Sequence, residues 1–306
     1  MSKKSFLMLI LFSAFILTAA GAFAQDAPKH PLFFRNDPSK YMDAKYPHGG
    51  AGSVRYMSLT PSDTMKSQFL FVHRGVLMPK SGLGEHVHRK MEEMYFVLDT
   101  TTCQFTVGGR TAELPGPALA LCPMGSSHGI YNPTDHPVEF INFGVTLENR
   151  QYDAVDFAKE NDLSVRKIES PPPFLWNHLD KNALHPVPAF YNGKGQMYIR
   201  SLWTTESFRT NWGFVNHYLI PAGNSIGYHQ HKVMEEVYYI FSGSGRLTID
   251  GATLEVKAGD AVTCPIGSSH GFYNNSGKDT EIISIAVPLE KGKYDGITRN
   301  DDLTKR

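Results

Sequence analysis

Short apolar runs alternate with clusters of turn-forming residues along most of the chain. The runs are rich in aromatic and β-branched side chains and lie at residues 69–72, 95–98, 238–241 and 281–287. The alternation of apolar and polar residues before Asp250-Gly251 is typical of a strand that ends in a tight hairpin. Many short strands at this spacing predict an all-β fold, a sandwich or a barrel, of which the jelly roll is a common form.

The pattern of the first half of the chain recurs in the second half. Residues 122–132 and 264–274 are identical at nine of eleven positions, with an offset of 142. Upstream of this motif, residues 86–95 match residues 229–238 at an offset of 143. Ordered identities of this kind indicate two homologous units fused in tandem.

These repeats divide the chain into two domains with flanking segments. The predicted ranges are an N-terminal arm at 25–52, the N-terminal domain at 53–150, a linker at 151–195, the C-terminal domain at 196–290 and a tail at 291–306. Within the linker, residues 151–162 are predicted to form a short helix. Pro171-Pro172-Pro173 then marks a stiff, extended connector.

The first 24 residues read as a secretory signal peptide. Lys3 and Lys4 precede an apolar run at 6–17, and Ala22-Phe23-Ala24 supplies small residues for cleavage after Ala24. The apolar run is shorter than the ~20 residues that span a bilayer, although an uncleaved anchor remains the alternative. We therefore expect a secreted or periplasmic protein with no membrane association after cleavage.

The charge and cysteine content exclude several classes of protein. The chain has 30 Lys and Arg residues against 30 Asp and Glu residues, so nothing predicts electrostatic capture of nucleic acid. The three cysteines, Cys103, Cys122 and Cys264, do not form a disulfide framework for a chain of this size. We interpret all three as small buried residues.

Each repeat carries three histidines and a glutamate at the same spacing. Two histidines lie two residues apart, so that on a strand their imidazoles point the same way. A glutamate follows the second histidine by five residues, which requires an intervening turn or bulge, and the third histidine comes more than thirty residues later. The predicted metal ligands are His86, His88, Glu93 and His128 in the first repeat, and His229, His231, Glu236 and His270 in the second.

The glutamate of each set is one of an adjacent pair. Glu92 and Glu235 are therefore alternative ligands, although Glu93 and Glu236 fit the usual spacing better. Because neighbouring residues on a strand face opposite ways, we expect the other member of each pair to be a solvated neighbour.

These motifs resemble those of the cupin superfamily. The first cupin motif matches Gly223, His229, His231, Glu236 and Gly243, and the second matches Gly259, Pro265, Gly267, His270 and Asn274. The N-terminal repeat keeps its ligands but holds Lys80, Thr100 and Pro117 at three of the motif glycines. The resemblance covers about 53–147 and 196–290, and it implies a bicupin: two tandem double-stranded β-helix (jelly-roll) barrels with a short helical linker, as in oxalate decarboxylases and bicupin quercetin dioxygenases.

Three imidazoles and one carboxylate suit a divalent first-row metal and leave positions open for other ligands. We expect up to two ions per chain. The resemblance implies Mn or Fe, while Cu, Zn, Ni and Co remain compatible with these ligands. Because the C-terminal repeat matches both motifs at every position, the sequence favours it as the site of chemistry.

Alternation along the strands suggests further residues near each metal set. Tyr95 and Tyr238 lie two residues after the ligand glutamates and are candidate pocket residues. Ile130 and Phe272 follow the third histidines by two residues and would make the pocket apolar. His73 and His217 are weaker candidates for groups behind the ligands, and all of these residues have core packing as the alternative.

Three classes of function remain open. The first is a metal-dependent dioxygenase or decarboxylase acting on a small oxygen-rich molecule, for which Arg55, Arg74 and Arg200 are candidate substrate-binding arginines. The second is a redox-neutral isomerase or lyase that stabilises an enediolate. The third is a non-catalytic metal- or ligand-binding protein, which two intact ligand sets disfavour. The expected partner is a small-molecule substrate, and a homo-oligomer is compatible with the sequence.

Overall fold

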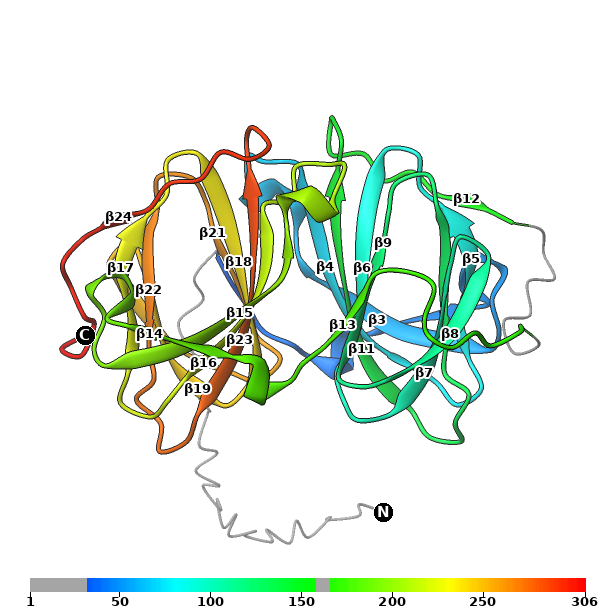
Figure 1. Ribbon diagram of the computed structural model, residues 1–306, viewed down its shortest axis with the longest axis horizontal. Coiled ribbons are helices and arrows are strands. Elements are labelled where there is room, and N and C mark those ends of the chain that lie inside the picture. Colours follow the sequence, from blue (N-terminus) through cyan, green and yellow to red (C-terminus); the bar gives the residue numbers. More distant parts are fainter. Residues whose placement is uncertain (1–31, 158–165) are drawn as a thin grey trace, which may run out of the picture.

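The computed structural model describes residues 32–157 and 166–306, and it contains two β-barrels that lie side by side (Figure 1). Each barrel combines one seven-stranded and one five-stranded antiparallel sheet. No α-helix occurs among the described residues, and none of their helices is long and apolar enough to cross a membrane. The prediction of an all-β fold with two tandem jelly-roll barrels is confirmed.

The N-terminal barrel pairs the sheet β13-β9-β6-β11-β4-β3-β2 with the sheet β12-β5-β10-β7-β8. Its strands are β2 (Met42–Lys45), β3 (Ser53–Thr60), β4 (Phe69–Leu77), β5 (Gly82–Val87), β6 (Met91–Val97), β7 (Thr102–Val107), β8 (Arg110–Pro115), β9 (Ala118–Cys122), β10 (Ser127–Tyr131), β11 (Val138–Thr146), β12 (Val155–Asp156) and β13 (Trp176–His178).

The C-terminal barrel repeats this arrangement with the sheets β1-β21-β18-β23-β16-β15-β14 and β20-β19-β22-β17-β24. Its strands are β1 (Phe33–Phe34), β14 (His185–Pro188), β15 (Gln196–Thr204), β16 (Phe214–Ile220), β17 (Ser225–Gln230), β18 (Met234–Ser242), β19 (Ser244–Ile249), β20 (Ala252–Lys257), β21 (Ala261–Cys264), β22 (Ser269–Tyr273), β23 (Thr280–Pro288) and β24 (Ile297–Thr298).

Short 3-10 helices form the remaining regular turns. They are η1 (Pro38–Lys40), η2 (Pro47–Gly49), η3 (Ser62–Thr64), η5 (Lys181–Ala183), η6 (Phe190–Asn192) and η7 (Thr205–Ser207). The η2 and η6 turns are equivalent in the two barrels, and they pack against β5 and β17, the strands that carry His86 and His229. His48 and Tyr191 have the same left-handed backbone conformation in these turns, with φ of 53° in both.

Segments outside the two predicted domains also join the sheets. The arm contributes β1, which pairs with β21 of the C-terminal barrel, and the linker contributes β13, which pairs with β9 of the N-terminal barrel. The predicted helix at 151–162 is wrong over 151–157, because Val155 and Asp156 pair instead with Val87 and His86 as strand β12. Residues 158–162 of that prediction lie outside the described residues.

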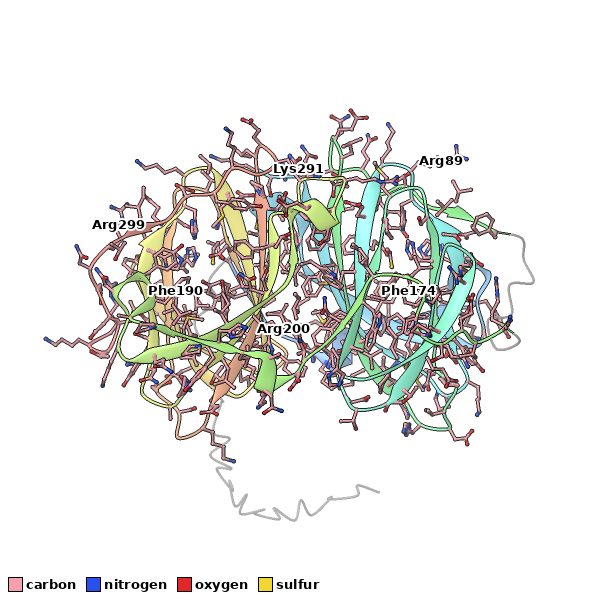
Figure 2. All side chains as sticks on the ribbon, viewed as in Figure 1. Arg89, Phe174, Phe190, Arg200, Lys291 and Arg299 are labelled. Atoms are coloured by element: carbon pink, nitrogen blue, oxygen red, sulfur yellow. The ribbon has the colours of Figure 1, made fainter. Side chains whose placement is uncertain are left out.

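Arg200 fastens the linker to the C-terminal barrel. This side chain of β15 lies between the two barrels (Figure 2). Its guanidinium donates to the carbonyl oxygen of His178 at 2.9 Å and to the side-chain oxygen of Asn177 at 3.1 Å, both on β13. Through these two hydrogen bonds Arg200 serves the joint between the barrels, and it does not line the cavity beside the N-terminal ligands.

The large sheets of the two barrels pack against each other through a shared hydrophobic core. Aromatic side chains meet across the joint, with Phe96 stacked on Phe241 at 5.4 Å and Phe143 edge-on to Tyr239 at 6.4 Å. Each barrel also has an interior core of its own. The face of each large sheet that points away from its own barrel interior is buried in the joint. This burial accounts for the apolar side chains on that face.

Two buried glutamates reach across this joint in opposite directions. Glu92 of the N-terminal barrel accepts hydrogen bonds from the backbone of Arg209 at 3.0 Å and of Thr210 at 2.8 Å, and from the Thr210 hydroxyl at 2.7 Å. Glu235 of the C-terminal barrel accepts from the backbone of Lys66 at 2.9 Å and of Ser67 at 2.7 Å. Both side chains have no exposed surface. The prediction that they are solvated neighbours of the ligands is wrong, because their face of the sheet is covered by the second barrel.

Replacing Glu92 with Ala should destabilise the joined barrels. The change leaves the two buried donors of Thr210 and the part-buried N–H of Arg209 without an acceptor, and each unsatisfied buried group costs roughly 1–3 kcal/mol. We expect the free energy of unfolding to fall by about 3 kcal/mol or more, measured by denaturant titration. Glu113→Ala is the control, since Glu113 is an exposed residue bonded to Gln104. Equal effects of the two variants would contradict the assigned role of Glu92.

Candidate metal centres

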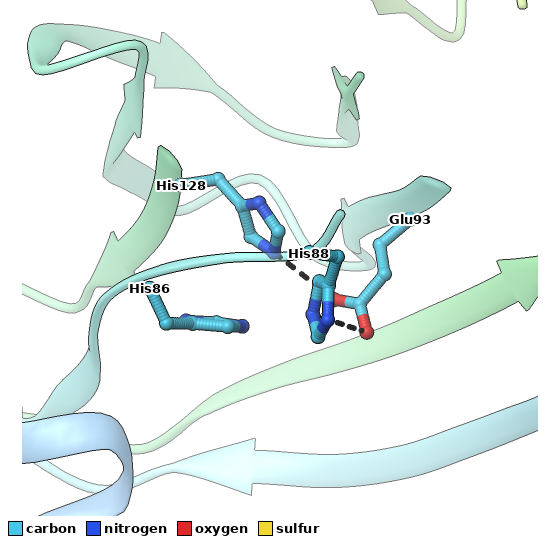
Figure 3. Close-up of side chains that lie close together, drawn as sticks. All are labelled: His86, His88, Glu93 and His128. Carbon is cyan, nitrogen blue, oxygen red and sulfur yellow. Dashed lines mark hydrogen bonds and ion pairs between the residues drawn. The ribbon is translucent and has the colours of Figure 1, made fainter. Parts of the chain in front are cut away.

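The four predicted ligands of each barrel converge on one point. His86 lies at the end of β5, His88 follows it, Glu93 lies on β6 and His128 on β10 (Figure 3). In both barrels the potential ligand atoms of the four residues lie within 4.8 Å of one another, and all eight residues are buried. A turn at Arg89 and Lys90 separates β5 from β6, and it brings the carboxylate to the histidines from the neighbouring sheet.

Backbone carbonyl groups orient the first two imidazoles of each set. His86 Nδ1 lies 2.9 Å from the carbonyl oxygen of Gly84, and His88 Nδ1 contacts that of Asp153. Since a carbonyl can only accept, each Nδ1 carries the proton and each Nε2 keeps its lone pair. The same contacts recur in the C-terminal barrel, from His229 to Gly227 at 2.8 Å and from His231 to Asp295.

The Nε2 atoms of these four histidines are buried and have no hydrogen-bond partner among the described residues. A buried acceptor without a partner is costly unless another group satisfies it. In the N-terminal barrel the free Nε2 atoms face the Glu93 carboxylate, with 3.3 Å between His88 Nε2 and Glu93 Oε1. A divalent cation satisfies all of these atoms together, so the residues present fit a metal ion.

The charge state of the two sets also suits a cation. Burial alone would raise the pKa of the Glu93 carboxyl, but its contacts with His128 and His88 outweigh burial and hold the pKa well below its usual range. The pKa of Glu236 is lowered in the same way by its three histidines. Burial lowers the pKa of His270 to about 4. Burial would lower the pKa values of His88 and His231, but their contacts with Glu93 and Glu236 raise them. Metal binding requires neutral imidazoles, so an ion at either set competes with a proton on these two histidines.

A second polar residue supports each ligand carboxylate. Asn142 of β11 donates to Glu93 Oε2 at 3.0 Å, and Ser284 of β23 donates to Glu236 Oε1 at 3.1 Å. These two residues occupy equivalent positions in the repeats. Groups of this kind hold a ligating carboxylate in one orientation.

A cavity of about 690 Å³ adjoins the N-terminal set and includes Glu93 in its wall. The described residues that line it are Pro47, His48, Val54, Tyr56, Ser58, Pro61, Leu70, Phe71, His73, Leu83, Glu93, Tyr95, Phe140, Asn142, Arg150 and Tyr152. The volume is in the range of small-molecule sites. Of the two candidate pocket tyrosines, Tyr95 is therefore placed in this wall.

The C-terminal barrel has different side chains at positions equivalent to those around the cavity. Tyr218 stands at the position of Gly75, as the pairing of β16 with β23 shows. Its ring meets Tyr238 edge-on at 6.3 Å and Phe190 at 6.3 Å. The sequence favoured this barrel for chemistry because of its complete motifs. The cavity of about 690 Å³ lies beside the N-terminal set.

The remaining candidate residues lie away from the metal sets or within the cores. His217 lies on the outer side of β16 and contacts Glu281 at 2.9 Å, and Arg74 pairs with Glu139 at 2.6 Å on the equivalent strand. Arg55 pairs with Asp43 at 3.0 Å. None of these three side chains lines the cavity. Ile130, Phe272 and the three cysteines are buried core residues, and burial raises the pKa of each cysteine thiol.

A domain model of the cupin family matches residues 216–286. An oxalate-binding protein from Thermotoga maritima is 30% identical over 97 residues, which make up 32% of this chain and 80% of that protein. The chain belongs to the cupin superfamily. With two such barrels it is a bicupin, as the resemblance of its motifs predicts.

Solved structures share the architecture of this bicupin over most of its length. Bacillus subtilis oxalate decarboxylase, a protein with Mn(II) centres, matches with a TM-score of 0.60 and 16% identity over 88% of this chain and 79% of that one. A variant of salicylate 1,2-dioxygenase from Pseudoaminobacter salicylatoxidans, in complex with gentisate, matches with a TM-score of 0.63 and 15% identity over 88% and 86%. At these identities the likeness shows the fold alone.

Sequence reasoning missed four residues around the N-terminal cavity. They are His48, Arg150, Tyr152 and Asp156, and three of them lie in the wall. A signal existed for Tyr152, because Tyr152-Asp153 recurs as Tyr294-Asp295 at the repeat offset. His48 and Asp156 come from the arm and the linker, which only the folded barrel brings beside β5.

Metal uptake tests the two ligand sets separately. We expect the purified bicupin, reconstituted with Mn²⁺ and desalted, to retain two ions per chain, one for each group. His229→Ala should reduce this to one, because it removes an oriented Nε2 ligand from the C-terminal set. His136→Ala is the control, since His136 belongs to neither group. Elemental analysis measures the content, and full retention in His229→Ala would show that the ligand assignment is wrong.

Proposed function

We propose that this bicupin is an exported metalloenzyme, a dioxygenase or decarboxylase that acts on a small oxygen-rich organic molecule in its N-terminal barrel. The observation that carries the proposal is the cavity of about 690 Å³ whose wall includes Glu93, one of the four converging ligand residues of the N-terminal barrel. A ligand set that borders a substrate-sized cavity is suited to chemistry, whereas a closed set serves structure.

A divalent cation bound by His86, His88, Glu93 and His128 would supply Lewis-acid and, for Mn or Fe, redox chemistry. Mn is supported by the Mn(II) centres of the structurally similar oxalate decarboxylase. The chain's own residues prepare the site. The carbonyl oxygens of Gly84 and Asp153 hold two imidazoles in the ligating tautomer, and Asn142 holds the carboxylate. Aromatic and aliphatic walls exclude water from the bound molecule.

The neighbours of this chain support small organic acids as substrates. An oxalate-binding protein is a relative by sequence, and oxalate decarboxylase and a gentisate-bound dioxygenase share its fold. The redox-neutral isomerase or lyase remains the alternative, and the activity assay separates it from the first proposal.

Activity should depend on the N-terminal ligands. With the Mn²⁺- or Fe²⁺-loaded protein and a panel of small acids, diketones and phenols, we expect oxygen consumption or carbon dioxide release. His86→Ala should lower the rate by roughly a hundredfold or more, since a metal ion contributes several kcal/mol to such reactions. His229→Ala should retain most of the activity. Product formation without oxygen or carbon dioxide would favour the isomerase or lyase, and loss of activity only in His229→Ala would place the chemistry in the C-terminal barrel.

Export rests on the sequence of residues 1–24, which lie outside the described residues. The positive start, the short apolar run and Ala22-Phe23-Ala24 support a cleaved signal peptide. We expect the mature protein from its native cell to begin at Gln25 and to be recovered from the periplasm or the medium. N-terminal sequencing of the fractionated protein measures this, and a chain that retains residues 1–24 in the membrane fraction would contradict export.

A further inference from the structure

A chain of three polar side chains borders the N-terminal cavity. His48 Nδ1 lies 2.6 Å from an Asp156 carboxylate oxygen, and His48 Nε2 lies 3.2 Å from the Tyr152 hydroxyl. The His48 ring is stacked on the ligand His86, with 3.7 Å between ring centroids and an angle of 11° between their planes. The Tyr152 ring meets the ligand His88 edge-on at 5.1 Å. The cluster therefore lies directly beside the metal ligands.

This chain of contacts gives the Tyr152 hydroxyl a defined direction. Because the Asp156 carboxylate accepts from Nδ1–H of His48, the Nε2 atom of the neutral ring is an acceptor. The Tyr152 hydroxyl then donates its proton to that nitrogen. Its oxygen keeps lone pairs for a further hydrogen bond. Tyr152 is thereby prepared to accept a hydrogen bond from a donor on a molecule in the cavity.

Among the described residues that line the cavity, Arg150 supplies a positively charged side chain. Its guanidinium also donates to the carbonyl oxygen of Met65, which holds the side chain in place. The Arg150 backbone is left-handed, with φ of 47°, at a position where the other repeat has Gly292 with φ of 77°. Residues other than glycine are uncommon in this conformation, and strained residues of this kind cluster at ligand sites. A guanidinium matches the geometry of a carboxylate.

The walls of the cavity favour a ring between these polar groups. Tyr56, Phe71, Tyr95 and Phe140 supply aromatic faces, and a cavity of about 690 Å³ leaves most of its space unfilled by a two-carbon acid. Aromatic side chains pack against planar rings in stacked or edge-on arrangements.

We propose that the N-terminal cavity binds a ring-bearing hydroxy acid, whose carboxylate pairs with Arg150 and whose hydroxyl donates to Tyr152. His48 and Asp156 are positioning residues that hold Tyr152 in its accepting orientation. This assignment rests on the proposed function, because it names the substrate class of the same site.

The C-terminal barrel lacks this arrangement and provides an internal control. Tyr191 stacks on His229 at 3.8 Å in place of His48, and Thr298 pairs with His229 where Asp156 pairs with His86. The Tyr294 hydroxyl donates instead to the carbonyl oxygen of Gly213 at 3.0 Å. The ligand sets of the two barrels are thus alike, whereas the residues that would recognise a substrate differ.

Calorimetric titration of the Mn²⁺-loaded full chain with 2-hydroxybenzoate, benzoate and phenol tests the assignment. We expect 2-hydroxybenzoate to bind best. Tyr152→Phe should weaken the affinity for 2-hydroxybenzoate by roughly 3- to 10-fold, because it removes one hydrogen bond, and should leave the affinity for benzoate unchanged. Arg150→Gln should weaken the affinity for both acids by roughly 10-fold or more and leave the affinity for phenol unchanged. Tyr294→Phe is the matched control and should change none of the three affinities.

The positioning role of His48 has a readout of its own. His48→Phe keeps a ring over His86 but cannot accept from Tyr152, so the preference for 2-hydroxybenzoate over benzoate should fall as in Tyr152→Phe. In the double variant the preference should fall no further. If His48→Phe weakens the affinity for both acids equally, the variant has only a packing defect, and the positioning role of His48 is overturned.

Metal content, measured on each sample, separates the two levels of proposal. A wild-type chain that retains no ion in the N-terminal set overturns the proposed function. A chain that retains its metal but binds none of the three probes, or in which Tyr294→Phe has the larger effect, overturns the hydroxy-acid assignment and leaves the metal site intact.

Discussion

In each barrel the metal centre and the joint between the barrels depend on two adjacent glutamates of one strand. The two side chains point to opposite faces of the sheet. On β6, Glu93 faces the histidines inside the barrel and Glu92 faces the neighbouring barrel, where it accepts from Arg209 and Thr210. Glu236 and Glu235 repeat this division on β18. Because side chains alternate along a strand, a shift of either strand that disturbs the joint also displaces a metal ligand.

The fold orients the ligands through backbone carbonyls, which do not depend on the identity of a side chain. Gly84 and Asp153 accept from His86 and His88 through main-chain oxygens, as Gly227 and Asp295 do in the other barrel. Once the strands are paired, the tautomers and the directions of the free Nε2 atoms follow. This explains how the two repeats keep the same buried ligand geometry although the residues around them have diverged.

Divergence is concentrated where segments from outside the barrels cover the ligands. The η2 turn places His48 on His86, whereas the η6 turn places Tyr191 on His229. Within the barrels, Tyr218 of β16 stands at the position of Gly75 of β4. The two centres therefore have the same potential ligands, but the N-terminal one adjoins a substrate-sized cavity.

The sequence by itself determined the all-β class, the duplication and the eight candidate ligands, because all three depend on periodicity and spacing along the chain. It placed Glu92 and Glu235 in solvent and predicted a helix near Gln151, since the surroundings of a strand face and of a linker depend on distant segments. The choice between the two barrels also needed the tertiary structure. The motif glycines favoured the C-terminal repeat, but the cavity depends on His48 from the arm, Tyr152 from the linker and Phe140 from the barrel meeting in space. Ligand spacing is a local property of the chain, whereas an open volume is a property of everything that packs around it.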